Sequence, residues 1–74
     1  MATARHKVSA PFFVMEYMDN LADIRKEKGL SRRNIADETG VRIDYVAQYE
    51  RGYCFPNRQN YNKLAKFFNW EEWD

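Results

Sequence analysis

The chain has 74 residues, of which 45% are hydrophobic and 16% aromatic, a composition that suits one small domain with a core of large rings. Its net charge of +1 by itself argues weakly against a nucleic-acid partner. One cysteine and one histidine exclude both an internal disulfide and a zinc site of four Cys and His ligands. The apolar run from Phe12 to Met15 is too short to cross a bilayer, and no cleavage site follows it. We therefore expect a cytoplasmic protein with no membrane partner, metal or cofactor.

The first segment, residues 1–8, lacks apolar periodicity and contains the run Arg5-His6-Lys7. Chain termini of this kind are commonly loosely ordered. We predict a flexible basic N-terminal arm at residues 1–8 and a single domain at residues 9–74.

The first helix is predicted to begin at Ser9 or Ala10, either of which can take the cap, with Pro11 tolerated in the first turn. Gly29 would end it. Between these points one apolar stripe recurs at intervals of three and four residues, formed by Val14, Tyr17, Met18, Leu21 and Ile24. This spacing predicts one continuous helix.

Phe12 and Met15 lie off that stripe. As large apolar side chains they need a partner of their own, since exposed apolar patches mark interaction sites. They can pack against Trp70 or Trp73 near the end of the chain, or they can form a contact in a dimer.

A short helix follows, with a cap on Ser31 and an end at Thr39-Gly40. Its inward positions are Ile35 and Ala36. A turn of this kind sets the helix at a steep angle to the next one. Glycine is needed there because the chain reverses in a conformation that a Cβ disfavours.

The next helix follows Val41 and ends at Gly52, with Val46 and Tyr49 facing inward. The last helix begins at a cap on Asn57. Its buried face and its left-handed C-terminal residue are Tyr61, Leu64, Ala65, Phe68 and Asn69. No strand pattern competes, so we predict an all-α fold, a compact domain of four to five helices containing a helix-turn-helix.

Charge is unevenly distributed along this chain. Residues 25–58 carry +3, residues 12–24 carry −3 and residues 59–74 carry −1. A local excess of Lys and Arg is typical of a nucleic-acid-binding surface, although ordinary solvated faces would produce the same composition.

The run LADIRKEKGLSRRNIADETGVRIDYVAQYERG, followed by a proline and by YNKLAKFF, resembles the lambda-repressor-like, Xre-type helix-turn-helix domain of phage and bacterial regulators. The resemblance covers residues 21 to about 70. It implies a compact helical domain that binds duplex DNA through the major groove.

The resemblance also implies roles for particular residues. Arg32, at the start of the second helix of the family, and Arg51, after the third, would contact backbone phosphate. Arg25 and Glu50 would pair to orient the recognition helix. The outward face of that helix, which would meet base edges and phosphates, consists of Arg42, Ile43, Asp44, Tyr45 and Gln48.

The residue types partly support these roles. The forked arginine side chain suits phosphate or guanine, and Gln48 can form a bidentate pair with adenine. Tyr45, one turn earlier, can reach a phosphate or a thymine methyl group. Cys54, with no histidine near it in the sequence, is expected to be a bystander.

Two positions depart from the family pattern. Arg42 stands where a capping Ser or Thr is common, and Asp44 is expected to take over by favouring the positive end of the helix. An aspartate facing DNA would be repelled by phosphate, and its one favourable base partner is the cytosine amino group. Ile43 can contact a thymine methyl group or anchor a protein partner.

The sequence thus predicts a sequence-specific DNA-binding transcriptional regulator, dimeric on paired half-sites, and a small phage, plasmid or mobile-element switch protein. The alternative is an antirepressor-like module that engages another regulatory protein. An enzyme is not expected, because no nucleophile–base pair, carboxylate dyad or phosphate-binding glycine loop is visible.

Overall fold

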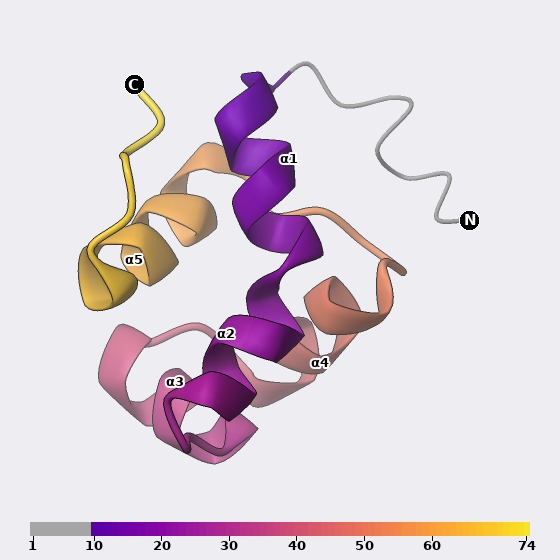
Figure 1. The fold of residues 1–74 in the computed structure, drawn as a ribbon, viewed down its shortest axis with the longest axis vertical. Coiled ribbons are helices and arrows are strands. Elements are labelled where there is room, and N and C mark those ends of the chain that lie inside the picture. Colours follow the sequence, from indigo (N-terminus) through magenta and orange to yellow (C-terminus); the bar gives the residue numbers. More distant parts are fainter. Residues whose placement is uncertain (1–9) are drawn as a thin grey trace.

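Five α-helices follow one another in the computed structural model, which describes residues 10–74 (Figure 1). The described part of the chain contains no strand and measures 30 × 25 × 20 Å, and none of its helices is long and apolar enough to cross a membrane. The all-helical prediction is therefore confirmed, whereas the predicted arm and Ser9 lie outside the described residues. The helices are α1 (Phe12–Asp19), α2 (Leu21–Glu27), α3 (Arg32–Thr39), α4 (Ile43–Arg51) and α5 (Arg58–Phe68).

The prediction of one continuous N-terminal helix is wrong, because the helix is broken at Asn20. The Asn20 side chain donates a hydrogen bond of 2.9 Å to the backbone oxygen of Glu16. Asparagine competes for backbone groups in this way, and it favours helix ends over helix interiors. The start also differs from the expectation, since Pro11 occupies the N-cap position and no side chain caps α1.

The predicted ends of α3 and α5 are confirmed. The Ser31 hydroxyl accepts from the Asn34 backbone N–H at 3.0 Å, and the Asn34 side chain accepts from the Ser31 N–H at 2.9 Å. This reciprocal capping box satisfies two backbone donors that a helix start leaves unpaired. At α5, Asn57 accepts from the Asn60 N–H at 2.8 Å, and Asn69 ends the helix at φ 63°.

A tight turn joins α3 to α4. Gly40 adopts φ 81° there, a left-handed conformation that an L side chain would strain. The Thr39 hydroxyl donates to the Ile35 carbonyl at 2.7 Å and accepts from the Val41 N–H at 3.1 Å. The turn therefore holds α3 and α4 in one packed unit, with Ile35 and Val41 buried on its inner side.

The core is formed by buried side chains from all five helices. In Figure 1, α5 lies to the left of α1, and α3 and α4 lie toward the lower end of the molecule. Tyr61 is fully buried, which raises the pKa of its phenol to about 12, and its hydroxyl donates to the Glu71 backbone oxygen at 2.7 Å. Trp70 stacks on Tyr17 with ring centroids 4.7 Å apart, so the C-terminal segment is tied to α1. The fully buried large side chains are Tyr61, Leu21, Ile35, Leu64, Val14 and Val46.

Candidate nucleic-acid interface

The outward side of α4 carries the residues that the sequence assigned to a recognition helix. Val46 and Tyr49 face the core, as predicted, with 0% and 7% exposure. Ile43 and Tyr45 face solvent, with 42% and 38% exposure. The helix thus presents a mixed face of apolar, aromatic and charged groups, and Gln48 lies partly buried at its edge.

At the start of α4, Arg42 takes the N-cap position with no side-chain cap bond. Its guanidinium donates to the Asp44 carboxylate, from Nε at 3.2 Å and from a terminal nitrogen at 3.1 Å. The same guanidinium lies 5.3 Å from the centre of the Tyr45 ring. Asp44 therefore binds Arg42 instead of capping the helix by a hydrogen bond, although its place in the first turn still suits the helix dipole.

Glu50 is the centre of a partly buried charge network that spans three helices. Its side chain is 2% exposed and accepts from Arg25 at 2.6 and 3.2 Å and from Arg32 at 2.9 Å. Arg25, which is 12% exposed, also donates to the Leu30 carbonyl at 3.0 Å. The geometry ties α2 and the start of α3 to the end of α4, so this network positions the outward face of α4.

The pKa values in this network reflect its geometry. Burial alone would raise the pKa of Glu50, but the hydrogen bonds from Arg25 and Arg32 outweigh it and hold that pKa below its ordinary value. The hydrogen bond to Glu50 also raises the pKa of Arg25. Glu50 and Arg25 are consequently both charged near neutral pH.

Sequence reasoning assigned Arg32 to phosphate and did not foresee its bond with Glu50. Only Nε of Arg32 is used in that bond, and the side chain remains 38% exposed. The terminal nitrogens can therefore still reach a ligand from the start of α3. Arg51 is exposed in the last turn of α4 and directly follows Glu50, the partner of Arg32.

Gln48 has a neighbour that was also not foreseen. The Cys54 thiol, on the loop after α4, donates to the Gln48 side-chain oxygen at 3.3 Å. Cys54, which the sequence suggested to be a bystander, thus contacts a residue of the candidate interface. Sequence separation hides this contact, since it depends on how the loop folds back.

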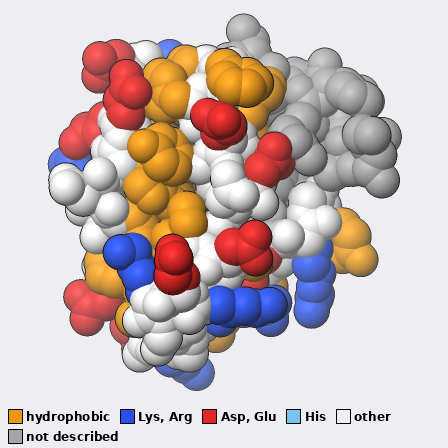
Figure 2. Space-filling model, viewed as in Figure 1, with side chains coloured by type: hydrophobic (Ala, Val, Ile, Leu, Met, Phe, Trp, Pro, Cys, Tyr) orange, Lys and Arg blue, Asp and Glu red, His pale blue; other side chains and the backbone are white. Residues whose placement is uncertain are grey.

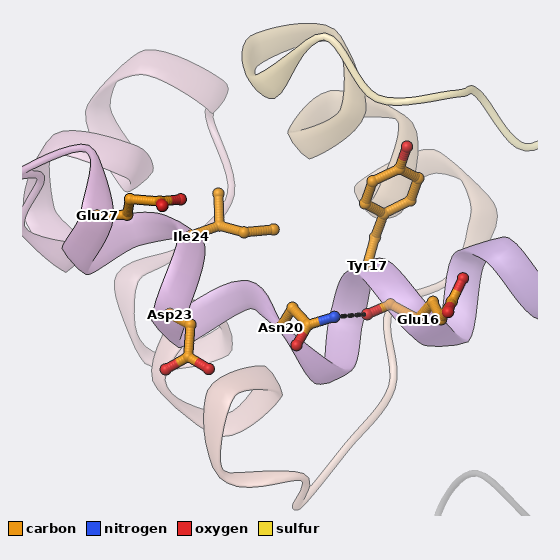
Figure 3. A pocket seen from close by; sticks show the side chains of 6 residues that line it. All are labelled: Glu16, Tyr17, Asn20, Asp23, Ile24 and Glu27. Atoms are coloured by element: carbon orange, nitrogen blue, oxygen red, sulfur yellow. Dashed lines mark hydrogen bonds between the residues drawn. The ribbon is translucent and has the colours of Figure 1, made fainter.

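In contrast to the arginines near α4, the bend between α1 and α2 carries an acidic groove of about 530 Å³ (Figure 3). The hydrogen bond from Asn20 to Glu16 lies at the bend. Figure 2 shows acidic side chains on the upper part of this face and most of the visible basic ones toward the end that holds α3 and α4. The groove would repel a polyanion because its lining is Glu16, Tyr17, Asn20, Asp23, Ile24 and Glu27.

A family model described as a helix-turn-helix domain matches residues 19–72. The chain belongs to the helix-turn-helix domain family. The match starts at the end of α1 and includes α2 to α5, so most of α1 lies outside it. No curated protein and no solved structure matches the chain.

Within the matched region, α3 and α4 are two helices joined by a tight glycine turn, which is the arrangement of a helix-turn-helix unit. Membership indicates a DNA-binding regulator in general terms, and such regulatory domains typically bind without catalysing a reaction. In residues 10–74, no group of three or more His, Cys, Asp or Glu side chains is placed to hold a metal ion.

Proposed function

We propose that this helix-turn-helix domain is a sequence-specific regulator of transcription of the lambda-repressor-like, Xre type, acting in the cytoplasm. Its second motif helix, α4, would lie in the major groove of duplex DNA. The observation that carries the proposal is the exposure of two arginines at the end of α4: Glu50 holds the part-exposed Arg32 there, and the exposed Arg51 is the next residue of the helix.

In this mechanism the arginines and the helix face have different tasks. Arg32 and Arg51 would contact phosphates and set the register of the protein on the duplex. Tyr45 and Gln48 would then meet base edges, and Ile43 would pack on a thymine methyl group. The acidic α1–α2 groove would face away from the duplex, which gives the encounter a preferred orientation.

Titration of a random-sequence duplex at several salt concentrations tests this proposal. A protein that neutralises phosphates loses affinity with a slope of about −0.9 in log K against log salt for each phosphate contacted. We expect a slope steeper than about −1.8, which corresponds to two phosphate contacts. Absence of binding even at low salt would sink the proposal.

The ion pair between Arg42 and Asp44 is expected to weaken the binding of DNA. Asp44 partly neutralises Arg42 at the end of α4 that would face the groove. Asp44→Asn is therefore expected to raise affinity for random-sequence DNA roughly three- to tenfold, which is about the effect of gaining one phosphate contact. Filter binding at fixed salt measures it, and Asp37→Asn on α3 is the matched charge control. A direct contact of Asp44 with cytosine would be revealed if Asp44→Asn instead weakened binding to the selected operator.

A homodimer on paired half-sites is the proposed assembly. Phe12, on α1, is 74% exposed, whereas Met15 is half-buried beside it, so packing on the C-terminal tryptophans has not covered Phe12. We expect Phe12→Asp to shift the protein toward monomer by at least tenfold in the dissociation constant, measured by sedimentation equilibrium. An unchanged monomer–dimer equilibrium would remove α1 from the dimer contact.

One set of observations favours a second candidate function, the binding of another regulatory protein. Ile43 is 42% exposed at the helix start, and Arg42 is engaged by Asp44 in the free protein. An apolar anchor beside a neutralised charge suits a protein surface better than a phosphate. Failure to bind duplex DNA at low salt, together with loss of partner binding in Ile43→Ala, would establish this candidate instead.

A further inference from the structure

The loop after α4 folds back against the edge of the proposed recognition surface. Gly52 ends the helix at φ 76°, a left-handed conformation, and its N–H donates to the Tyr49 carbonyl at 3.2 Å. The Tyr53 N–H then donates to the Gln48 carbonyl at 3.0 Å. These two backbone bonds reverse the chain and place Cys54 beside the side chain of Gln48.

The contact between the two side chains has a defined polarity. The Cys54 sulfur lies 3.3 Å from Oε1 of Gln48, and both residues are partly buried. Burial, and then the nearby negative charge of Asp44, raises the pKa of the Cys54 thiol. The thiol therefore remains protonated near neutral pH and acts as a donor to the carboxamide oxygen.

Such a bond restricts a torsion that is otherwise broad. The terminal carboxamide of glutamine rotates in a wide, roughly two-fold well, so an unattached Gln48 would lose freedom on meeting a base. With Oε1 held toward Cys54, rotation of the carboxamide is restricted and its plane has a preferred orientation. The second lone pair of the oxygen and the two N–H groups remain available to a ligand.

We propose that Cys54 is a positioning residue for Gln48 and that the pair selects adenine at one operator position. The inference rests on the proposed DNA-binding function. Bidentate recognition of adenine needs a carboxamide that accepts from N6–H and donates to N7 in one plane. A carboxamide oriented before binding meets this requirement at a smaller entropic cost.

The test uses the full chain and an operator obtained by selection from random duplexes. The native protein and Gln48→Ala are first compared on operators in which each adenine is replaced in turn. The adenine read by Gln48 is the one whose replacement lowers the affinity of the native protein but not that of Gln48→Ala. Discrimination for that adenine is then measured in Cys54→Ser, which keeps a donor, and in Cys54→Ala, which removes it. We expect Cys54→Ser to stay within about twofold of the native protein and Cys54→Ala to lose roughly fivefold in discrimination, the size of one hydrogen bond.

Two further measurements separate positioning from a general structural effect. Affinity for random duplex and its salt slope are expected to be unchanged in Cys54→Ala, and thermal melting is expected to show a folded protein. In a Gln48→Ala background, Cys54→Ala is expected to have no further effect on discrimination.

Three outcomes would overturn the inference: discrimination unchanged in Cys54→Ala, the same loss in the Gln48→Ala background, or no adenine assigned to Gln48. In each of these cases retained salt-dependent binding to random duplex leaves the proposed function standing. Absence of all DNA binding by the native protein would instead overturn both.

Discussion

Glu50→Ala is expected to lower the free energy of unfolding by about 3 kcal/mol, because it leaves the largely buried side chain of Arg25, which is 12% exposed, without its counter-charge. A domain of this size has a total stability of about 4–11 kcal/mol, so the loss is a large fraction of it. The melting temperature is expected to fall by more than about 12 °C. Thermal and urea unfolding monitored by circular dichroism measure both quantities.

The exposed pair between Arg42 and Asp44 supplies the control for this result. Asp44→Ala removes an ion pair of similar geometry, but its partners are 70% and 49% exposed, so we expect a loss below about 0.5 kcal/mol. The pH dependence provides a second check. Since the pKa of Glu50 is lowered in the folded protein, its contribution is present above its ordinary value of 4.5 and is lost as the pH falls below it.

The stability difference between the native protein and Glu50→Gln is therefore expected to be large at neutral pH and to shrink in acid. A Glu50→Ala variant that melts within a few degrees of the native protein would contradict the structural role given to this network. It would show that water solvates the two guanidinium groups well enough to replace the lost carboxylate.

Arg51→Ala is expected to reduce affinity for random-sequence DNA roughly eightfold at 0.1 M salt and to make the salt slope shallower by about 0.9, the effect of one lost phosphate contact. Combining it with Arg32→Ala is expected to give roughly a 60-fold loss and a slope change of about 1.8. Fluorescence anisotropy across a salt series measures both parameters. Random-sequence DNA is used because phosphate contacts contribute to the binding of any sequence, whereas base contacts do not.

Lys66→Ala is the matched control, since it removes one exposed positive charge from α5, outside the α3–α4 unit. It is expected to change the slope by less than about 0.3, as a distant charge is screened at this ionic strength. Equal effects of Lys66→Ala and Arg51→Ala would show that binding depends on overall charge and not on the proposed face. Arg51→Ala has a further advantage over Arg32→Ala, because Arg32 also bonds Glu50 and its loss affects stability.

Most of the helical framework could be predicted from local sequence. Ser31, Gly40, Asn57 and Asn69 mark helix ends by side-chain chemistry or backbone conformation, and each acts within about four residues. The buried faces follow from spacing in the same way. The prediction failed at Asn20, where the apolar stripe continues without interruption although the backbone is broken by a competing side chain.

Which residues at the start of α4 are exposed was predictable from the sequence, but their bonding partners were not. Arg42, Asp44 and Tyr45 are neighbours on one helix end, yet the structure decides that the carboxylate binds the guanidinium and leaves the helix without a side-chain cap. A periodic pattern indicates which side of a helix faces out. It does not indicate which of several nearby polar groups bond one another in the free protein.

The sequence by itself determined that this is an all-helical chain with a short helix, a glycine turn and a second helix whose Val46 and Tyr49 face inward, because caps, glycines and spacing act over a few residues. The family resemblance implied the pair of Arg25 and Glu50, but only the tertiary structure decided the other long-range contacts. Arg32 also binds Glu50, at a separation of 18 residues, and Cys54 reaches Gln48 across a reversed loop. Such contacts depend on how the helices and loops pack in three dimensions, and the geometry that brings the groups within hydrogen-bond distance has no signature in the order of the residues.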